Sequence, residues 1–433
     1  MVKISFANHS YCYFHCTAKE GTMATDPLIV NISMIEAVAL AVLTYALGLR
    51  IKKRVPLLQK LSMPAPVIGG MLFASILSIL EANGIAQFKF DSTLQTLLML
   101  AFFTTIGLSA SVKLIINGGK LLVMFLIAAS VLGVFQNAIG MWIAEAMGID
   151  FHYGLLAGGV SLMGGLGTSA AFGPYFEQTY GITGGTVTAI TAATFGMAVA
   201  LMIGGPFGEW LIRRYKVVTP ISVKQPGEKL HVPEDLEASI VDDHAAGSPA
   251  LSDELMMAVG MIVICMAIGG FLSAWLGQFI TLPAYIGSMI AAACVRNLSD
   301  FTGKLKIEPK ALNAVAEICL ILYVTMAINS LKLHELVNLA VPLMVILIFQ
   351  TILMLVFAWA VLFYMFGKTY DAVMLAVGGI GFGMGATANG LANMQALSEK
   401  YGSSPQAWLI VSVVGAFLID LVNALIITWF AAL

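Results

Sequence analysis

The sequence predicts an all-α polytopic membrane protein with about ten transmembrane helices, arranged in two inverted five-helix repeats that each carry a glycine-rich re-entrant hairpin. Three observations lead to this prediction. The 433 residues are 59% hydrophobic and only 11% charged, whereas soluble domains average about 25% charged residues. Apolar segments of membrane-spanning length follow one another along both halves of the chain. A glycine-rich motif, GGLGTSAA at residues 164–171, has a counterpart in GGIGFGMGATANGL at 378–391.

The composition also argues against several classes of protein. A soluble chain of this size could not cover so much apolar surface with its few polar residues. The formal net charge of −2 provides no basic face for nucleic acid. Cys12 and Cys16 lack the spacing of a zinc site, and no signal peptide is predicted in residues 1–22.

A helix needs about 20 mostly apolar residues to cross the hydrocarbon core of a bilayer. Two apolar segments, 155–175 and 372–393, contain the repeated glycines and are too interrupted to be spans, so we expect each to form a re-entrant hairpin. Continuous spans are expected near residues 33–51, 63–82, 94–114, 119–147 and 184–212, and then near 254–277, 281–296, 312–331, 337–366 and 405–431.

These segments divide the chain into four parts. Residues 1–32 form an N-terminal tail, and residues 33–216 form the first repeat. Residues 217–253 are polar and contain several prolines and charges, which is typical of a flexible linker. Residues 254–433 form the second repeat.

Lysine and arginine fix the orientation, because cytoplasmic loops carry an excess of both. If the linker is cytoplasmic and both termini are external, all but four of the 22 basic residues lie on the cytoplasmic side. The four exceptions are Lys3, Lys19, Lys89 and Lys332. We therefore expect a multi-pass protein whose N-terminal tail and C-terminus are external.

The two halves of the chain resemble each other beyond the glycine motifs. MPAPVIGGM at 63–71 is similar to LPAYIGSM at 282–289, and FQ at 135–136 is matched by FQ at 349–350. Five spans in each half is an odd number, so the second half must be inverted in the bilayer relative to the first. Inverted repeats with interrupted segments in corresponding positions point to a secondary transporter whose site lies between the repeats.

The glycine motifs are predicted to form this site. Glycine permits a tight turn and a close approach of ligand to backbone. A half-helix that begins at such a turn offers free N–H groups and a positive dipole end, which suit a carboxylate. Glycine-mediated helix packing is the competing explanation. The candidate substrate-binding residues are Gly164, Gly165, Gly167, Thr168, Ser169, Gly383, Gly385, Thr387 and Asn389.

Polar residues inside the other spans are candidates for a cation site. Asp420 lies within the last span, where a carboxylate is costly and functional by default, and Asn423 follows one helical turn later. The remaining Na⁺ candidates are Thr104, Thr105, Gln136 and Asn137. For Gln136 and Asn137 an interhelical hydrogen bond is the favoured alternative. No nucleophile is paired with a recognisable general base, so we do not expect an enzyme.

Several long motifs resemble the bacterial sodium/glutamate symporter family. They include LLMLAFFTTIGLSASV, LMGGLGTSAA, YDAVMLAVGGIGFGMGATANGLANMQAL and VGAFLIDLVNALI, and the similarity extends from about residue 33 to the C-terminus, interrupted by the linker. Carried over by position, the family's loop residues are Gly164, Gly165, Gly167, Thr168 and Ser169, then Gly381, Gly383, Gly385, Ala386 and Thr387.

The resemblance implies a Na⁺-coupled importer of L-glutamate in the bacterial inner membrane. It further implies a homodimer and an elevator-type movement between outward and inward states. The chain departs from the family pattern at Met163 and Leu166, and at Ala388 and Asn389. A transporter of another carboxylate, such as aspartate or a citrate-like compound, therefore stays open, as does an ion channel from a different class.

Overall fold

The computed structural model describes residues 28–60, 63–220, 251–276, 278, 283–302, 308–334 and 339–433. Within these ranges, seven helices are long and apolar enough to cross a membrane. The prediction of an all-α polytopic membrane protein is confirmed at this level, while the count of ten spans and their inverted arrangement stay predictions. The seven are α1 (Met34–Arg54), α3 (Ala65–Ala82), α5 (Val112–Ala146), α8 (Gly185–Tyr215), α11 (Leu251–Leu276), α13 (Pro309–Asn329) and α14 (Ala340–Phe357) with its continuation η3 (Ala358–Phe363). Helix α5 is kinked at Gly119, and its membrane-spanning part is Gly119–Ala146.

Three of the predicted spans correspond to shorter or more polar helices. The third ends early, as α4 (Thr93–Ser109), because the chain leaves the helix at Ala110. The seventh is α12 (Ala284–Thr302), which contains a half-buried ion pair between Arg296 and Asp300 at 3.2 Å. The last is divided into α17 (Pro405–Val413), the π-helical turn η4 (Val414–Leu418) and α18 (Ile419–Ala431).

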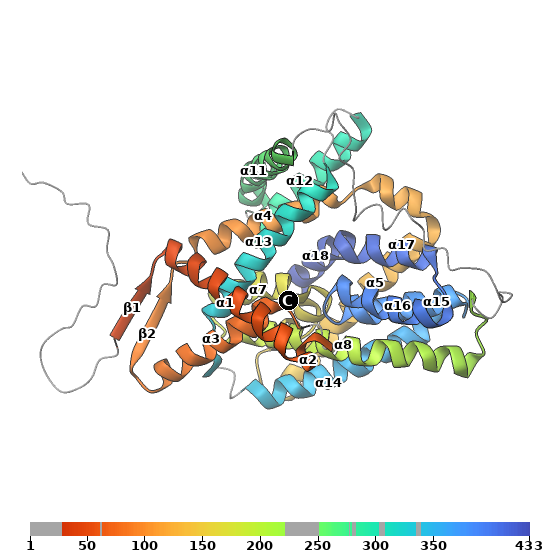
Figure 1. The fold of residues 1–433 in the computed structure, drawn as a ribbon, viewed down its shortest axis with the longest axis horizontal. Coiled ribbons are helices and arrows are strands. Elements are labelled where there is room, and N and C mark those ends of the chain that lie inside the picture. The colour runs from red at the N-terminus through yellow and green to blue at the C-terminus, as the bar shows by residue number, and fades with distance from the viewer. Residues whose placement is uncertain are drawn as a thin grey trace, which may run out of the picture.

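The helices pack in two groups. The first helix group consists of α1, α3, α4, α11, α12 and α13, with α4 lying against α12 and α13 (Figure 1). In this group α1 and α3 are in backbone contact, because a Cβ on either Gly48 or Gly69 would overlap the opposite main chain. Such small residues let membrane helices approach closely. The short helix α2 (Pro56–Lys60) follows α1.

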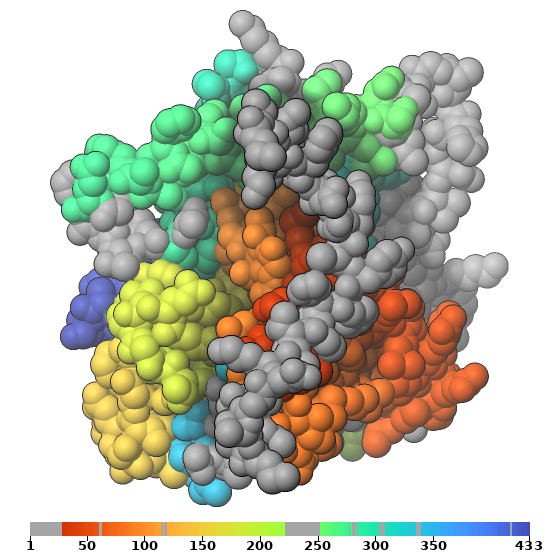
Figure 2. All heavy atoms as spheres, turned by 90° about the vertical axis from the view of Figure 1, so that its left-hand side faces the viewer, coloured from red at the N-terminus to blue at the C-terminus, as the bar shows by residue number. Residues whose placement is uncertain are grey.

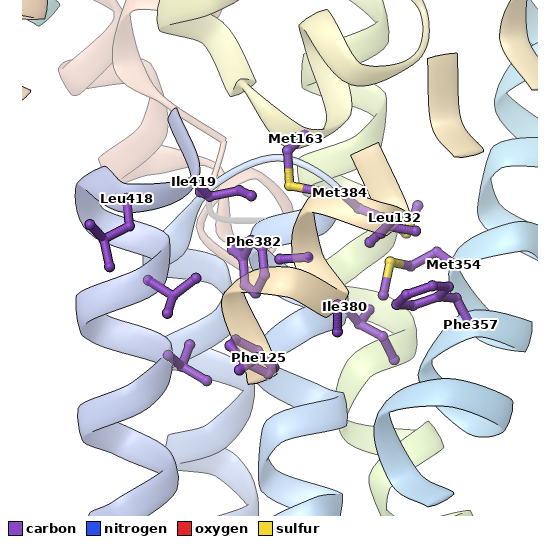
Figure 3. Close-up of a cluster of buried hydrophobic side chains, with 14 of the residues drawn as sticks. Phe125, Leu132, Met163, Met354, Phe357, Ile380, Phe382, Met384, Leu418 and Ile419 are labelled. Atoms are coloured by element: carbon purple, nitrogen blue, oxygen red, sulfur yellow. The ribbon is translucent and has the colours of Figure 1, made fainter. Parts of the chain in front are cut away.

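The second helix group contains α5, α8 and α14 together with the interrupted segments. The first interrupted segment is α6 (Phe151–Leu156), the π-helical turn η1 (Gly159–Met163) and α7 (Gly165–Tyr180). The second is α15 (Tyr370–Gly383) and α16 (Thr387–Tyr401), and α17, η4 and α18 complete the group. Figure 3 shows the core of this group, where Phe125 and Leu132 of α5 face Phe382 and Met354.

A small parallel sheet was not anticipated. Strand β1 (Leu28–Ile32) pairs with β2 (Ala86–Phe90), and Leu28 lies opposite Ala86. Residues 28–32, which we assigned to the N-terminal tail, are thus tied to the segment that joins α3 to α4. The sheet lies at one end of the molecule (Figure 1), and Figure 2 views that end, with green α11 across the top of the face and the red and orange segments of α1 to β2 at its lower right.

Candidate functional site

Two interruptions of helices, one in each half of the chain, meet inside the molecule. The first separates η1 from α7, where Gly165 has a φ of +66° in the left-handed region. The second separates α15 from α16 around Gly385. A Cβ on Gly165 would overlap the carbonyl oxygen of Gly385. Residue 165 therefore has to be glycine both for its backbone conformation and for lack of space.

A cavity of about 330 Å³ lies beside this contact, between the two helix groups. This volume is at the lower end of the range of about 300–1,000 Å³ for small-molecule sites. The second helix group lines it with Met163, Gly164, Gly165, Leu166, Gly167, Thr168, Met197, Phe382, Gly385, Ala386, Thr387, Gly415 and Asp420. The first helix group contributes an apolar wall of Pro64, Pro66, Phe102, Ile106, Leu320, Ile321 and Val324.

The polar groups of the cavity fall into two kinds. The first-turn N–H groups of α7 have no acceptor within their own helix, so they are available to an anion. Asp420, in the first turn of α18, supplies the one carboxylate among the lining residues of the described chain. The hydroxyl of Thr387 donates to the carbonyl oxygen of Gly415 and so ties the start of α16 to η4. Donors for a carboxylate and an acceptor for a cation thus share one cavity.

Two buried asparagines hold the first interruption from both sides. The N–H of Gly159 donates to Oδ1 of Asn137 at 2.9 Å, and Nδ2 of Asn423 donates to the carbonyl oxygen of Gly159 at 2.8 Å. Asn137 and Asn423 are each 1% exposed or less. A backbone that leaves regular helix geometry inside a membrane must find such partners. These amides therefore fix the start of η1 between α5 and α18.

A buried glutamine holds the second interruption. Nε2 of Gln136 donates to the carbonyl oxygen of Gly383 at 2.7 Å, at the end of α15. Nε2 of Gln350, from α14, donates to the carbonyl oxygen of Gln136 at 2.6 Å. Gln136 and Asn137 are neighbours on α5, so this one helix contacts both interruptions.

Three buried amide oxygens around the interruptions have no hydrogen-bond donor among the described residues. They are Oε1 of Gln136, Oε1 of Gln350 and Oδ1 of Asn423. Buried polar atoms are nearly always paired, which makes these three oxygens candidates for a further interaction. Hard cations take carbonyl and carboxylate oxygens as ligands, and Na⁺ is a cation of this kind.

Comparison with known proteins decides the family. A family model described as sodium/glutamate symporter matches residues 30–403. The sodium/glutamate symporter of Escherichia coli strain K12 is 39% identical over 388 residues, which cover 89% of this chain and 94% of that protein. The chain belongs to the sodium/glutamate symporter family. The sodium/glutamate symporter of Haemophilus influenzae is 38% identical over 397 residues, covering 90% of this chain and 95% of that protein.

Membership of the sodium/glutamate symporter family confirms the resemblance inferred from the sequence motifs. The named relatives are transporters and not enzymes, in agreement with our expectation. The family match includes both glycine motifs and ends at residue 403, before Asp420 and Asn423. The family match therefore does not include these two residues, and a role for them in ion binding is argued from their position in the structure.

Several predicted site residues of this symporter-family chain do not line the cavity. Ser169 is buried in α7, where its hydroxyl donates to Gly165 at 2.7 Å. Nδ2 of Asn389 donates to the carbonyl oxygen of Met197 on α8 at 3.1 Å. The hydroxyls of Thr104 and Thr105 donate to carbonyl oxygens of their own helix, α4, at 2.7 and 2.6 Å. Their contribution to binding stays a prediction, as does that of Gly383, which accepts the bond from Gln136.

Sequence reasoning missed other parts of this site. Gly159 and Gly415 were not singled out, although both accept hydrogen bonds that hold the interruptions in place. Gln350 was noted as the counterpart of Gln136 in the other repeat and expected to form an interhelical hydrogen bond, but Gln136 was not named as its partner. A detectable signal existed for Gly415, because it lies five residues before Asp420 in the unusual stretch GAFLID.

Proposed function

We propose that this chain is a secondary active transporter that couples the import of L-glutamate to Na⁺, with both ligands bound at the meeting point of the two interruptions. The main support is the cavity beside the Gly165–Gly385 contact, which combines free helix N–H groups with the carboxylate of Asp420. The names of the family and of the relatives support the same substrate and ion.

Each ligand has a complementary part of the cavity. A glutamate carboxylate would accept hydrogen bonds from the first turn of α7 and from the hydroxyl of Thr168. The hydroxyl of Thr387 already donates to Gly415, so its remaining lone pairs are free to accept from the substrate ammonium. In the cavity Asp420 would bind Na⁺, and the unpartnered oxygens of Asn423 and Gln136, which lie outside the cavity lining, are further candidate ligands. Coupling follows if the cavity closes only when substrate and ion are both present.

Alternating access is supported by a second cavity in the described part of the molecule. This cavity has a volume of about 370 Å³ and is lined by β2, by the loop before α8 and by Lys332. Val187 and Ala327 line this cavity and Val324 lines the first, and all three belong to one cluster of buried apolar side chains. In the orientation that the basic residues favour, Lys332 is external, so the site would face inward here. An elevator-type movement of the second helix group past the first would open the site to this second cavity, on the external side.

The same proposal includes the setting of the transporter. It would cross the bacterial inner membrane with both termini external, the linker 217–253 inside and the glycine motifs as re-entrant hairpins from opposite sides. It would act as a homodimer. The positive-inside distribution of lysine and arginine supports the orientation, and the resemblance supports the dimer.

Uptake of labelled L-glutamate into proteoliposomes tests the function directly. The purified full-length chain is the sole protein, and uptake is followed with an inward Na⁺ gradient and with K⁺ in its place. Unlabelled aspartate and citrate are added as competitors, and protein-free liposomes give the background. We expect accumulation only with the Na⁺ gradient and inhibition by excess glutamate but not by citrate.

The other outcomes are informative. Accumulation that citrate abolishes would identify a different carboxylate as the substrate. Glutamate uptake that is equal with Na⁺ and K⁺ would contradict Na⁺ coupling. A current that persists without substrate, at far more than about 10³ ions per second, would instead indicate a channel, because this is the upper range of carrier- and enzyme-like turnover.

A further inference from the structure

Basic and aromatic side chains gather where α8 ends and α15 begins, and none of them lines the cavity. We define the basic aromatic patch as Arg214, Tyr215, Trp359, Tyr364 and Lys368. Nε1 of Trp359 donates to the hydroxyl of Tyr215 at 2.7 Å, and the hydroxyls of Tyr215 and Tyr364 are 3.2 Å apart. These hydrogen bonds join the end of α8 to η3 and the residue that follows it, and both α8 and η3 pack against α15 (Figure 1).

Cations of the patch cover its tyrosine rings. Nζ of Lys368 lies 4.1 Å from the ring centroid of Tyr364, and Cζ of Arg214 lies 5.9 Å from that of Tyr215. Both distances are within the range of cation–π attraction. The ammonium group of a zwitterionic headgroup would find these two rings occupied by cations of the protein. The patch is therefore better suited to an anion.

Among the described residues, no acidic side chain forms an ion pair with the basic groups of the patch. The nearby Glu209 forms its ion pairs with Arg213 at 3.3 Å and with Lys400 at 2.5 Å. Arg214 and Lys368 are exposed and have no ion pair in the described part of the chain. Lys368 also has a φ of +57°, in the left-handed region, and immediately follows Gly367, which has a φ of +84°. The positive backbone angles place this lysine at the turn that leads into α15.

The patch also lies at the end of two apolar faces. On α8, Met202 is 63% exposed and Trp210 is 47% exposed, and on α14 Ile352 and Val356 are each 52% exposed. Exposed apolar side chains on a membrane helix face acyl chains. Tryptophan, tyrosine and basic residues that follow such a face lie at the level of the lipid headgroups.

We propose that the basic aromatic patch binds the phosphate of an anionic phospholipid in the leaflet on its side of the membrane. Arg214 and Lys368 pair with the headgroup phosphate, and the indole and phenol groups line its edge. The acyl chains lie against the exposed faces of α8 and α14. This site is separate from the transport cavity, so the proposal does not depend on the transported substrate.

Native mass spectrometry of the full-length protein tests this site. The delipidated protein is titrated with phosphatidylglycerol and, separately, with phosphatidylcholine. The double variant R214Q/K368Q is compared with the control K53Q/R54Q, which removes one lysine and one arginine from the exposed end of α1. Soluble glycerol phosphate is added as a competitor, and circular dichroism and size exclusion confirm that each variant is folded.

We expect the wild type and the control variant to retain phosphatidylglycerol in preference to phosphatidylcholine. The patch variant is expected to lose roughly tenfold or more in affinity, because each basic residue near a charged headgroup contributes about 1 kcal/mol. The conservative variant Lys368→Arg should keep the binding. Equal losses in both double variants, or equal retention of the two lipids, would overturn the proposal. Displacement by glycerol phosphate at equal concentration would replace the lipid site with a site for soluble phosphate.

Discussion

Gly165 and Gly385 are in backbone contact although they are separated by more than half of the chain. A Cβ on Gly165 would overlap the carbonyl oxygen of Gly385, and a Cβ on Gly385 would overlap Met197 of α8. The two interruptions therefore support each other, and the first turn of α7 is held at the cavity by contact with the other glycine motif. A methyl group at this point should disturb both sides of the site.

Replacement of Gly165 by alanine tests this contact. The left-handed conformation alone costs a residue other than glycine about 1–2 kcal/mol, and the overlap with Gly385 adds to this. We expect the initial rate of uptake to fall roughly tenfold or more. Gly181→Ala is the matched control, because Gly181 ends the same helix with a φ of +69° but has open space around its Cα. Equal losses in the two variants would show that backbone strain, and not the contact, is responsible.

Replacement of Asp420 by asparagine tests the cation site. The substitution keeps the size of the side chain and removes the carboxylate from the cavity. We expect a higher Na⁺ concentration for half-maximal uptake, because a carboxylate attracts the cation more strongly than a neutral amide does. The control is Asp91→Asn, since Asp91 lies outside the helices and accepts a hydrogen bond from the N–H of Thr93 at 2.8 Å. An unchanged Na⁺ dependence in folded Asp420→Asn protein would rule out this role.

Removal of an asparagine amide separates a role in ion binding from a role in stability. Asn423→Ala removes the side-chain donor to the carbonyl oxygen of Gly159, which keeps its bond from the N–H of Gly164 at 3.1 Å. Asn393→Ala likewise removes the side-chain donor to the carbonyl oxygen of Ala200, which lies 3.0 Å from Nδ2 of Asn393. Each lost hydrogen bond should cost about 0.5–1.5 kcal/mol of unfolding free energy. We expect only Asn423→Ala to raise the Na⁺ requirement for uptake. Thermal unfolding and Na⁺ titration of both variants measure the two effects, and parallel changes in Na⁺ requirement would refute the distinction.

Thr387 allows a test of the link between α16 and η4. Thr387→Val keeps the shape of the side chain but removes the hydroxyl that donates to Gly415. We expect Thr387→Val to raise the glutamate concentration for half-maximal uptake, while Thr387→Ser retains near wild-type uptake because it keeps the hydroxyl. Equal uptake by the valine variant and the wild type would mean that the hydroxyl is dispensable.

Much of the helical framework could be predicted because hydropathy reports directly on it. The predicted spans 33–51 and 312–331 correspond to α1 and α13 within three residues at each end. The positions of both interruptions were also predictable, since glycine is concentrated where regular helix geometry ends. Thr168, Thr387 and Asp420 were named from the sequence, and the structure places all three at one cavity.

The direction of individual amide groups was not predictable in the same way. An asparagine inside an apolar span can ligate a cation or satisfy a backbone group, and residue type does not distinguish the two. Asn137 and Asn423 contact Gly159 because of how α5 and α18 are oriented, which depends on tertiary packing. Strands β1 and β2 were missed for a related reason, because parallel pairing across three intervening helices leaves no local pattern in five residues.

The backbone contact between Gly48 and Gly69 gives any study of motion a fixed internal reference. Because α1 and α3 cannot slide past each other without a collision of their main chains, spin labels on their exposed faces should report one constant separation. Leu43 on α1 and Ile76 on α3, which are 65% and 52% exposed, are suitable labelling positions. Distances from these two labels to a third label on α16 would then change only when the second helix group moves relative to α1 and α3.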